Sequence, residues 1–258
     1  MSAVPRLLLA AICLACLSAG CQQSAPAGKD ELIVGAASSL RFAFQDLAPA
    51  FERQTGASVT LIFGSSGGLT TQIEQGAPID ILFSANEDFI ERLRQQEKVV
   101  PSTQQVYALG RIAVAVNDRG GAEPPELPAL LDPGVRRIAI ANPAHAPYGL
   151  AARQALEQAG LWDQLLPKLV LAENVEQTAQ FLRTGNAEAA IIAWSVAESP
   201  EIEYQLIETS LHLPLRHSAA VVADSPRQAL ARRFLRFVLG PEGQSIMSQH
   251  GFASVGER

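Results

Sequence analysis

Short β-rich runs alternate with segments of helical spacing along the chain, and this alternation constrains the fold more than any other feature. In the first part, predicted strands at 32–36, 59–63 and 79–83 are each followed by a predicted helix. These helices are predicted at 40–54, 69–75 and 89–96. Alternating β and α elements of this length favour a mostly parallel sheet with helices on both faces.

An apolar stretch at 112–116 is followed by a Pro- and Gly-rich segment at 120–133, and a second β/α series begins after this segment. Its predicted strands are 137–141, 169–172 and 189–193, and its predicted helices are 149–159 and 175–184. We interpret this series as a second lobe with its own sheet.

The last part of the chain has one predicted strand, 219–223, and the predicted helices 226–239 and 241–250. One strand is too little for a third domain, so we expect this part to return to the first lobe. The predicted fold class is therefore α/β with two lobes, lobe 1 formed by 31–109 plus 219–258 and lobe 2 by 110–218. Two hinge crossings are expected near Gly110 and His217.

Residues 1–20 have the pattern of a secretory signal, in which Arg6 precedes the apolar run 7–17 and small residues lead to Cys21. The apolar run is too short for a comfortable membrane span. We predict that Cys21 is the lipidated first residue of the mature chain and that 21–30 is a polar tether. The alternative is an ordinary signal cleaved nearby. Either reading predicts export, to the periplasm or the cell surface.

All three cysteines, Cys13, Cys16 and Cys21, lie in this leader. The folded part therefore has no thiol for a disulfide, a thiolate metal site or nucleophilic catalysis.

The formal net charge is −6, and the sequence has no basic block or aromatic-interleaved Lys/Arg stripe. This pattern argues against nucleic acid as a partner. An acidic protein that captures an anion must use local hydrogen-bond donors rather than its overall field.

Two pairs of serines stand at predicted strand-to-helix turns, Ser38 with Ser39 and Ser65 with Ser66. Such turns lie at the carboxyl ends of parallel strands, the edge where α/β sheets bind ligands. Helix N-termini there offer free N–H groups and a partial positive charge, to which serine adds neutral donors. The pattern favours an anion site. The alternative for each serine is a simple helix cap.

The second lobe offers further donors just after its predicted strands. Tyr148 lies in the Pro-containing turn 142–149 and carries a phenol O–H, and Val175 begins a helix with a backbone N–H. The alternative for Tyr148 is an aromatic ring that packs against a neighbour.

Nucleotide and hydrolase motifs are missing from the glycine-rich turn 64–68. It reads Gly-Ser-Ser-Gly-Gly, without the Lys-Ser or Lys-Thr pair of a phosphate loop and without Gly-x-Ser-x-Gly spacing. A nucleophilic serine with His145 or His217 as base remains a less favoured alternative. We expect no enzyme activity and no cofactor.

Several ordered motifs resemble those of the periplasmic molybdate-binding protein family, and the likeness covers nearly all of the mature chain. They are Ala-Ala-Ser-Ser-Leu at 36–40, Phe-Gly-Ser-Ser-Gly at 63–67, the run from Gln72 to Asp80, Phe-Ser-Ala-Asn at 83–86, Asn-Pro with His-Ala-Pro-Tyr-Gly at 142–149, and Gly-Pro at 240–241 with His-Gly-Phe at 250–252.

The resemblance implies a type II periplasmic-binding-protein fold that closes on a tetrahedral oxyanion, molybdate or tungstate, without any cation. It implies Ser39 and Ser66 as hydroxyl donors, Ser38 beside them, and donors at Tyr148 and Val175. It also implies delivery to an inner-membrane ABC permease. We expect a monomer.

The sequence departs from the family at 193–195, where many members have a ligand tyrosine and this chain reads Ala-Trp-Ser. We hypothesise that Tyr148 supplies the missing phenol. Sulfate, phosphate, a phosphonate or an organic acid remain alternative ligands on the same fold.

Overall fold

The computed structural model describes residues 31–117, 126–197 and 201–255 of the 258-residue chain. The predicted signal peptide at 1–20, the tether and Cys21 lie outside the described residues. None of the described helices is long and apolar enough to span a membrane.

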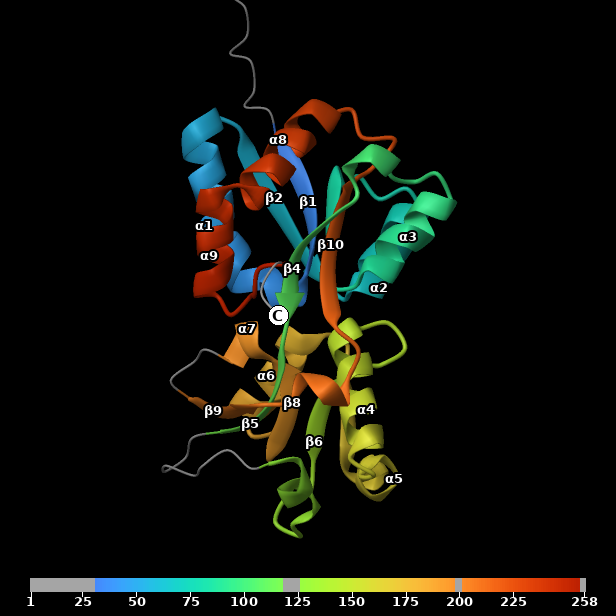
Figure 1. Ribbon diagram of the computed structural model, residues 1–258, viewed down its shortest axis with the longest axis vertical. Coiled ribbons are helices and arrows are strands. Elements are labelled where there is room, and N and C mark those ends of the chain that lie inside the picture. Colours follow the sequence, from blue (N-terminus) through green and yellow to red (C-terminus); the bar gives the residue numbers. More distant parts are fainter. Residues whose placement is uncertain (1–30, 118–125, 198–200, 256–258) are drawn as a thin grey trace, which may run out of the picture.

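Two five-stranded sheets form two lobes stacked along the long axis of the molecule (Figure 1). The strand order is β2-β1-β3-β10-β4 in lobe 1 and β7-β6-β8-β5-β9 in lobe 2. The lobe 1 strands are β1 Glu31–Ala37, β2 Ser58–Gly64, β3 Ile81–Ser84, β4 Gln105–Gly110 and β10 Leu215–Val221. The lobe 2 strands are β5 Ile112–Asn117, β6 Ile138–Ala141, β7 Leu169–Ala172, β8 Ala189–Ala193 and β9 Ile202–Leu206.

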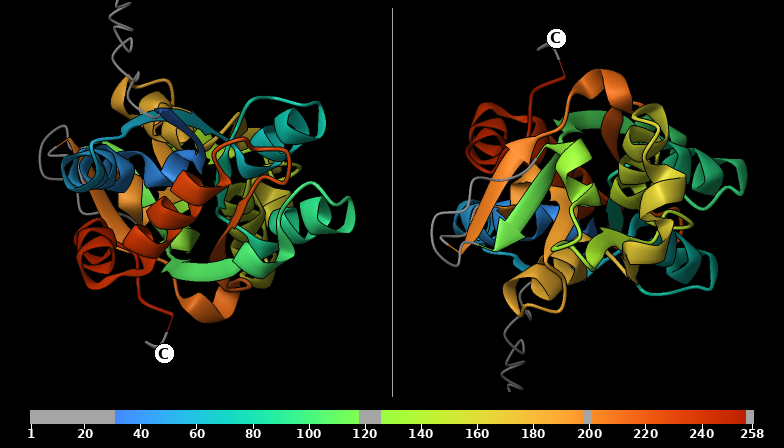
Figure 2. Two further views of the ribbon diagram at one scale, coloured as in Figure 1. Left: turned by 90° about the horizontal axis from the view of Figure 1, so that it is seen from above. Right: turned by 90° about the horizontal axis from the view of Figure 1, so that it is seen from below.

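Helices cover both faces of each sheet (Figure 2). In lobe 1, helices α1 Arg41–Thr55, α8 Gln228–Leu239 and α9 Pro241–Gln249 pack on one face, and α2 Ser66–Glu74 and α3 Glu87–Gln95 on the other. In lobe 2, α4 Pro147–Gln158 and the short α5 Trp162–Leu165 pack together, as do α6 Val175–Arg183 and the short α7 Trp194–Ala197.

The core of lobe 1 is built from the faces that the sequence periodicity predicts. Phe44 of α1 meets Phe83 of β3 edge-to-face, with ring centroids 4.9 Å apart. Phe234 of α8 lies 5.0 Å from Phe51 in the same geometry. Edge-to-face rings add stabilisation to the area they bury. This packing fixes α1, and with it the turn that precedes α1, against the sheet.

Each sheet is mixed. Strands β1, β2 and β3 run parallel, as do β6, β7 and β8, but β10 and β5 run antiparallel to their neighbours. The antiparallel strands β5 and β10 are those that the chain enters directly after each crossing between lobes. Because the carboxyl ends of the parallel strands in each lobe face the other lobe, a crossing chain enters the next sheet at that end and runs against its parallel strands. The two-lobe α/β fold predicted from the sequence is confirmed, with mixed rather than mostly parallel sheets.

The chain crosses between lobes twice. The first crossing follows Gly110, where β4 ends and β5 begins two residues later. The second lies between Leu206 and Leu215, the end of β9 and the start of β10. Residues 215–218 therefore lie in the lobe 1 sheet, slightly earlier than the expected boundary at 218/219.

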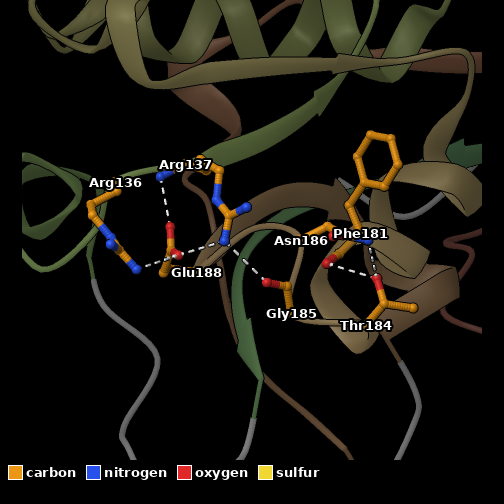
Figure 3. A network of polar contacts seen from close by, with 7 residues as sticks. All are labelled: Arg136, Arg137, Phe181, Thr184, Gly185, Asn186 and Glu188. Atoms are coloured by element: carbon orange, nitrogen blue, oxygen red, sulfur yellow. Dashed lines mark hydrogen bonds and ion pairs between the residues drawn. The ribbon is translucent and has the colours of Figure 1, made fainter.

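A polar network ties β6 to β8 at their amino ends, the end of lobe 2 away from lobe 1 (Figure 3). Glu188 accepts hydrogen bonds from the backbone N–H of Arg137 at 2.7 Å and from its guanidinium at 2.9 Å. Arg136 lies 3.6 Å from the same carboxylate. These hydrogen bonds lower the pKa of Glu188 to about 2. The carboxyl ends of the same strands are left to face lobe 1.

Candidate anion-binding site

A small cavity lies between the lobes, where the carboxyl ends of strands from both sheets meet. The lining residues come from the strand-to-helix turns of both lobes: Ala37, Ser38, Ser39, Gly64, Ser65, Ser66, Ala85, Ala146, Pro147, Tyr148, Asn174 and Val175. All five residues predicted to bind an anion are among them.

The sheet register brings the two serine pairs of lobe 1 together. Strands β1 and β2 pair in parallel, with Ala37 opposite Gly64, so the turns that follow them lie side by side. Ser38, Ser39, Ser65 and Ser66 are all buried.

Only one of these serines is a helix cap. Ser65 precedes α2, and its Oγ accepts a hydrogen bond of 3.2 Å from the N–H of Gly68. The Oγ of Ser66 instead accepts from the N–H of Ala85 at 2.9 Å. Since a hydroxyl can accept and donate at once, Ser66 keeps its own proton for another acceptor. The capping alternative therefore holds for Ser65 and not for Ser66.

Ser39 has an unused hydroxyl. Its Oγ is buried and makes no hydrogen bond within the described part of the chain. A buried polar group without a partner costs roughly 1–3 kcal/mol. A hydrogen-bond acceptor in the cavity would remove this cost.

Helix α6 of lobe 2 begins at the cavity wall, with Val175. Asn174 caps this helix, its Oδ1 accepting 3.1 Å hydrogen bonds from the N–H groups of Glu176 and Gln177. Val175 is the first residue of the helix, so its N–H has no acceptor within the helix. The cap thus leaves the N–H of Val175 available beside the cavity.

Tyr148 lies in the first turn of α4 and is 3% exposed, which makes it part of the cavity wall rather than of the surface. Its hydroxyl lies 3.0 Å from Nε2 of His217, on β10 of lobe 1. Burial is the main cause that raises the pKa of the phenol well above its ordinary value. Tyr148 therefore stays protonated and neutral over the physiological range.

The lobes contact each other directly around the cavity. The N–H of Gly67 donates to the carbonyl oxygen of His145 at 3.0 Å, and Nδ1 of His145 lies 3.1 Å from Oγ of Ser65. A Cβ on Gly67 would lie 2.8 Å from the same carbonyl oxygen, so glycine is required for this approach. The structure is therefore a closed form.

The described residues that line the cavity include no charged side chain. Arg41, which follows the first serine turn in the sequence, lies 3.8 Å from Glu176, and Arg183 binds Glu176 at 2.7 Å. No His, Cys, Asp or Glu cluster suited to a metal ion occurs in the described part of the chain. The site offers neutral donors and no counter-ion.

A serine–histidine–glutamate row is present at the edge of the cavity, but its geometry is not that of a catalytic triad. His145 faces Ser65 with Nδ1 and faces Glu173 with Nε2, at 3.7 Å. In hydrolase triads the serine faces Nε2 and the acid faces Nδ1. Ser65 also accepts the capping hydrogen bond, which lowers its capacity to act as a nucleophile.

The position where the sequence departs from its family lies next to the site. Trp194 turns away from the cavity wall, and its Nε1 donates to the hydroxyl of Tyr204 at 2.8 Å. Ser195 points toward lobe 1, and its Oγ donates to the carbonyl oxygen of Ser39 at 2.8 Å. Neither side chain is part of the cavity lining, whereas Tyr148 is.

Sequence reasoning missed two participants. The role of Ser195 as a contact between lobes was not anticipated, although it follows a predicted strand and that position was a usable signal. His217 had no such signal, because a histidine inside a predicted hinge carries no spacing pattern.

Comparison with known proteins decides the family. A family model described as bacterial extracellular solute-binding protein matches residues 32–253. This chain belongs to that family.

Similar proteins share nearly the full length of this solute-binding protein. The molybdate-binding protein ModA of Rhodobacter capsulatus is 29% identical over 236 residues, which cover 89% of this chain and 90% of that protein. ModA of Escherichia coli (strain K12) is 30% identical over 247 residues, 92% and 95% of the two chains. The structure of the Azotobacter vinelandii periplasmic molybdate-binding protein matches with a TM-score of 0.81 and 30% identity, covering 86% and 98%.

The resemblance to the periplasmic molybdate-binding proteins and the two-lobe binding-protein fold are thereby confirmed. The family is one of extracellular solute-binding proteins and not a family of enzymes.

Proposed function

We propose that this protein is the substrate-binding component of an ABC importer and that it captures molybdate or tungstate in the cavity between the lobes. The observation that carries the proposal is a cavity between contacting lobes, lined by hydroxyl and N–H donors and by no charged side chain among the described residues. The similar proteins named for molybdate binding support the same ligand.

The proposed ligand contacts are the hydroxyls of Ser39 and Ser66, the backbone N–H of Val175, and donors from Ser38 and Tyr148. Hydrogen bonds to a charged group contribute roughly 1.5–3 kcal/mol each, so several together offset the desolvation of a dianion. Closure of the lobes excludes water and strengthens each of these bonds.

The donor set favours an oxyanion that carries no proton at neutral pH. Molybdate and tungstate present only acceptors. Hydrogen phosphate carries an O–H that requires an acceptor, and no carboxylate lines the cavity among the described residues. Sulfate has the same charge as molybdate but is smaller, and it remains the main alternative together with phosphonates.

The test is a calorimetric titration of ligand-free protein with molybdate, tungstate, sulfate and phosphate. We expect binding heat with molybdate and tungstate, and an increase in Tm, because a ligand that binds the native state stabilises it. A response to sulfate or phosphate without a response to molybdate or tungstate would refute the ligand and leave the fold untouched.

We further propose that the protein acts outside the cytoplasm as a monomer, anchored through a lipid on Cys21, and delivers its ligand to an inner-membrane permease. The signal pattern before Cys21 and the family assignment support this. Cys21→Ala should move the protein from the membrane fraction to the soluble extracytoplasmic fraction; an unchanged distribution would contradict the anchor.

We propose that the protein has no hydrolase activity, since His145 is turned the wrong way for a triad. Incubation with a serine-reactive fluorophosphonate should leave Ser65 unlabelled by mass spectrometry. Stoichiometric labelling at Ser65 would reopen the hydrolase alternative.

A further inference from the structure

A buried row of side chains joins the candidate site to the core of lobe 1. Tyr148 of lobe 2 lies with its hydroxyl 3.0 Å from Nε2 of His217. On the other side of the ring, Nδ1 lies 3.3 Å from the hydroxyl of Tyr107, which lies 3.5 Å from the carbonyl oxygen of Ser84. His217 is fully buried and Tyr107 is 1% exposed, so solvent does not compete for these contacts.

The surroundings of His217 are neutral. The rings of Tyr107, Tyr148 and Phe252 surround the imidazole with centroids 5.1–5.8 Å away. Burial without a counter-charge lowers the pKa of His217 to about 3. The ring is therefore neutral at physiological pH, and one of its nitrogens is a donor while the other is an acceptor.

Because the imidazole is neutral, the hydrogen bonds along the row can run in either of two directions. If Nδ1 carries the proton, Nε2 accepts the proton of Tyr148, and the phenol has no proton left for the cavity. If Nε2 carries the proton, it donates to the Tyr148 oxygen, and Nδ1 accepts from Tyr107. The phenol proton is then not used by His217 and is available to the cavity that Tyr148 and Ser39 line.

An oxyanion in the cavity selects between the two directions because it accepts hydrogen bonds and donates none. We propose that His217 is a positioning residue for the site: as the Nε2–H tautomer it donates to Tyr148 and turns the phenol proton toward Ser39 and the bound oxyanion. This inference rests on the proposed function, and it names the residue that makes Tyr148 a donor there.

The first crossing leaves space for this contact. A Cβ on Gly110 would overlap the Tyr148 hydroxyl and would lie 3.0 Å from Nε2 of His217. Glycine at the first crossing therefore allows the hydroxyl and the imidazole to meet. Because His217 belongs to lobe 1 and Tyr148 to lobe 2, this contact forms only when the lobes are together.

The first test reads the tautomer in the unaltered protein. Long-range ¹H–¹⁵N NMR of ¹⁵N-labelled protein distinguishes a protonated ring nitrogen from a bare one, and His217→Gln identifies the signal among the four histidines. With molybdate bound, we expect Nε2 to be protonated and Nδ1 bare. A protonated Nδ1 in the complex would overturn the proposal.

The second test asks whether His217 acts through Tyr148. His217→Phe fills the space without hydrogen bonds, and we expect it to weaken molybdate binding roughly tenfold. In a Tyr148→Phe background the same change should have less than about a twofold effect, because coupled residues are not additive. His217→Gln, which keeps a donor near the Nε2 position, should restore affinity to within about threefold of the wild type.

Equal losses in both backgrounds would show that His217 is merely structural. If the wild type gives no binding heat with molybdate or tungstate, the proposed function fails instead. The wild-type titration alone therefore distinguishes failure of the proposed function from failure of the inference about His217.

Discussion

The hydroxyl of Ser195, in lobe 2, donates a hydrogen bond of 2.8 Å to the main-chain carbonyl oxygen of Ser39, in lobe 1. Both residues are buried, and Ser39 lines the candidate site. One contact between the lobes thus also fixes the backbone of the turn that presents the Ser39 hydroxyl.

Ser195→Ala should therefore weaken ligand binding while leaving the cavity lining intact. Removal of the donor leaves a buried carbonyl oxygen unpaired, and a loss of about 1 kcal/mol, roughly fivefold in Kd, is expected from the closed form. Calorimetry measures the loss, and small-angle scattering should show a more open average shape for the ligand-free variant. An unchanged Kd would mean that this contact does not support closure.

Ser39→Ala and Ser66→Ala should each weaken molybdate binding by about 1.5–3 kcal/mol, because each removes a hydroxyl donor to a charged ligand. Ser66→Ala should cost more stability than Ser39→Ala, since only Ser66 also accepts from Ala85. The matched control is Ser248→Ala on exposed α9, which should leave Kd unchanged. If both site variants bind molybdate with wild-type affinity, these serines have only a structural role.

Gly67→Ala should impair closure of the lobes without impairing folding. The added Cβ would lie 2.8 Å from the carbonyl oxygen of His145, a contact that exists only between closed lobes. Alanine also favours the helix α2 by up to about 1 kcal/mol. Tm of the ligand-free variant should therefore stay the same or rise, while the increase in Tm caused by molybdate should shrink. A variant that unfolds early without ligand would contradict this.

Stability should fall as the pH drops below 6.5, in part because of His217. Its pKa is about 3 in the folded protein against an ordinary value of 6.5. The unfolded chain therefore binds more protons between these values, so the stabilisation is complete above pH 6.5 and is lost on acidification. At pH 5 the loss is about 2 kcal/mol.

Denaturant unfolding at pH 7 and pH 5 measures this effect, and His217→Gln should show a smaller difference between the two pH values. His212, whose pKa burial also lowers, should account for part of the remaining slope in the same direction. An identical pH slope in wild type and variant would exclude a buried neutral His217.

Glu188→Gln should reduce stability at pH 7 and leave ligand binding unchanged, because Glu188 lies at the ends of β6 and β8 that face away from the cavity. Its side chain is 26% exposed, so we expect solvent screening to limit the loss to about 1 kcal/mol. With a folded pKa of about 2 against the ordinary value of 4.5, this contribution is present above pH 4.5 and lost between pH 4.5 and 2. Calorimetric Kd and chemical denaturation are the two measurements, and an altered Kd would contradict the assignment.

Much of the fold followed from local sequence patterns. Parallel strands with following helices were visible because each strand is a short apolar run and each helix buries one face, as Phe44 and Phe51 do in α1. Strand β5 was noted only as an apolar stretch, and the strands β4 and β9 were not predicted. The latter two are edge strands with exposed positions, such as Glu203 and Gln205 in β9, and their stability comes from pairing with a partner strand that is distant in sequence.

Some residues of the candidate site could likewise be predicted from local patterns, and others could not. Ser39, Ser66 and Val175 were predictable because turns at strand ends repeat a recognisable pattern. The partner of Tyr148 was not, because His217 reaches it only through the antiparallel placement of β10, and no local pattern specifies which side chain a returning strand places against another lobe.

The neutral lining of the cavity has an effect on the protein as a whole. Capture of a dianion adds two negative charges to a chain that already has a formal net charge of −6, with nothing in the lining to cancel them. The approach of the ligand is therefore opposed at long range, and dissolved salt, by screening that repulsion, should speed association rather than slow it. In native electrophoresis the ligand-bound form should therefore migrate as the more acidic species. Ligand-bound and ligand-free molecules can then be distinguished by their charge.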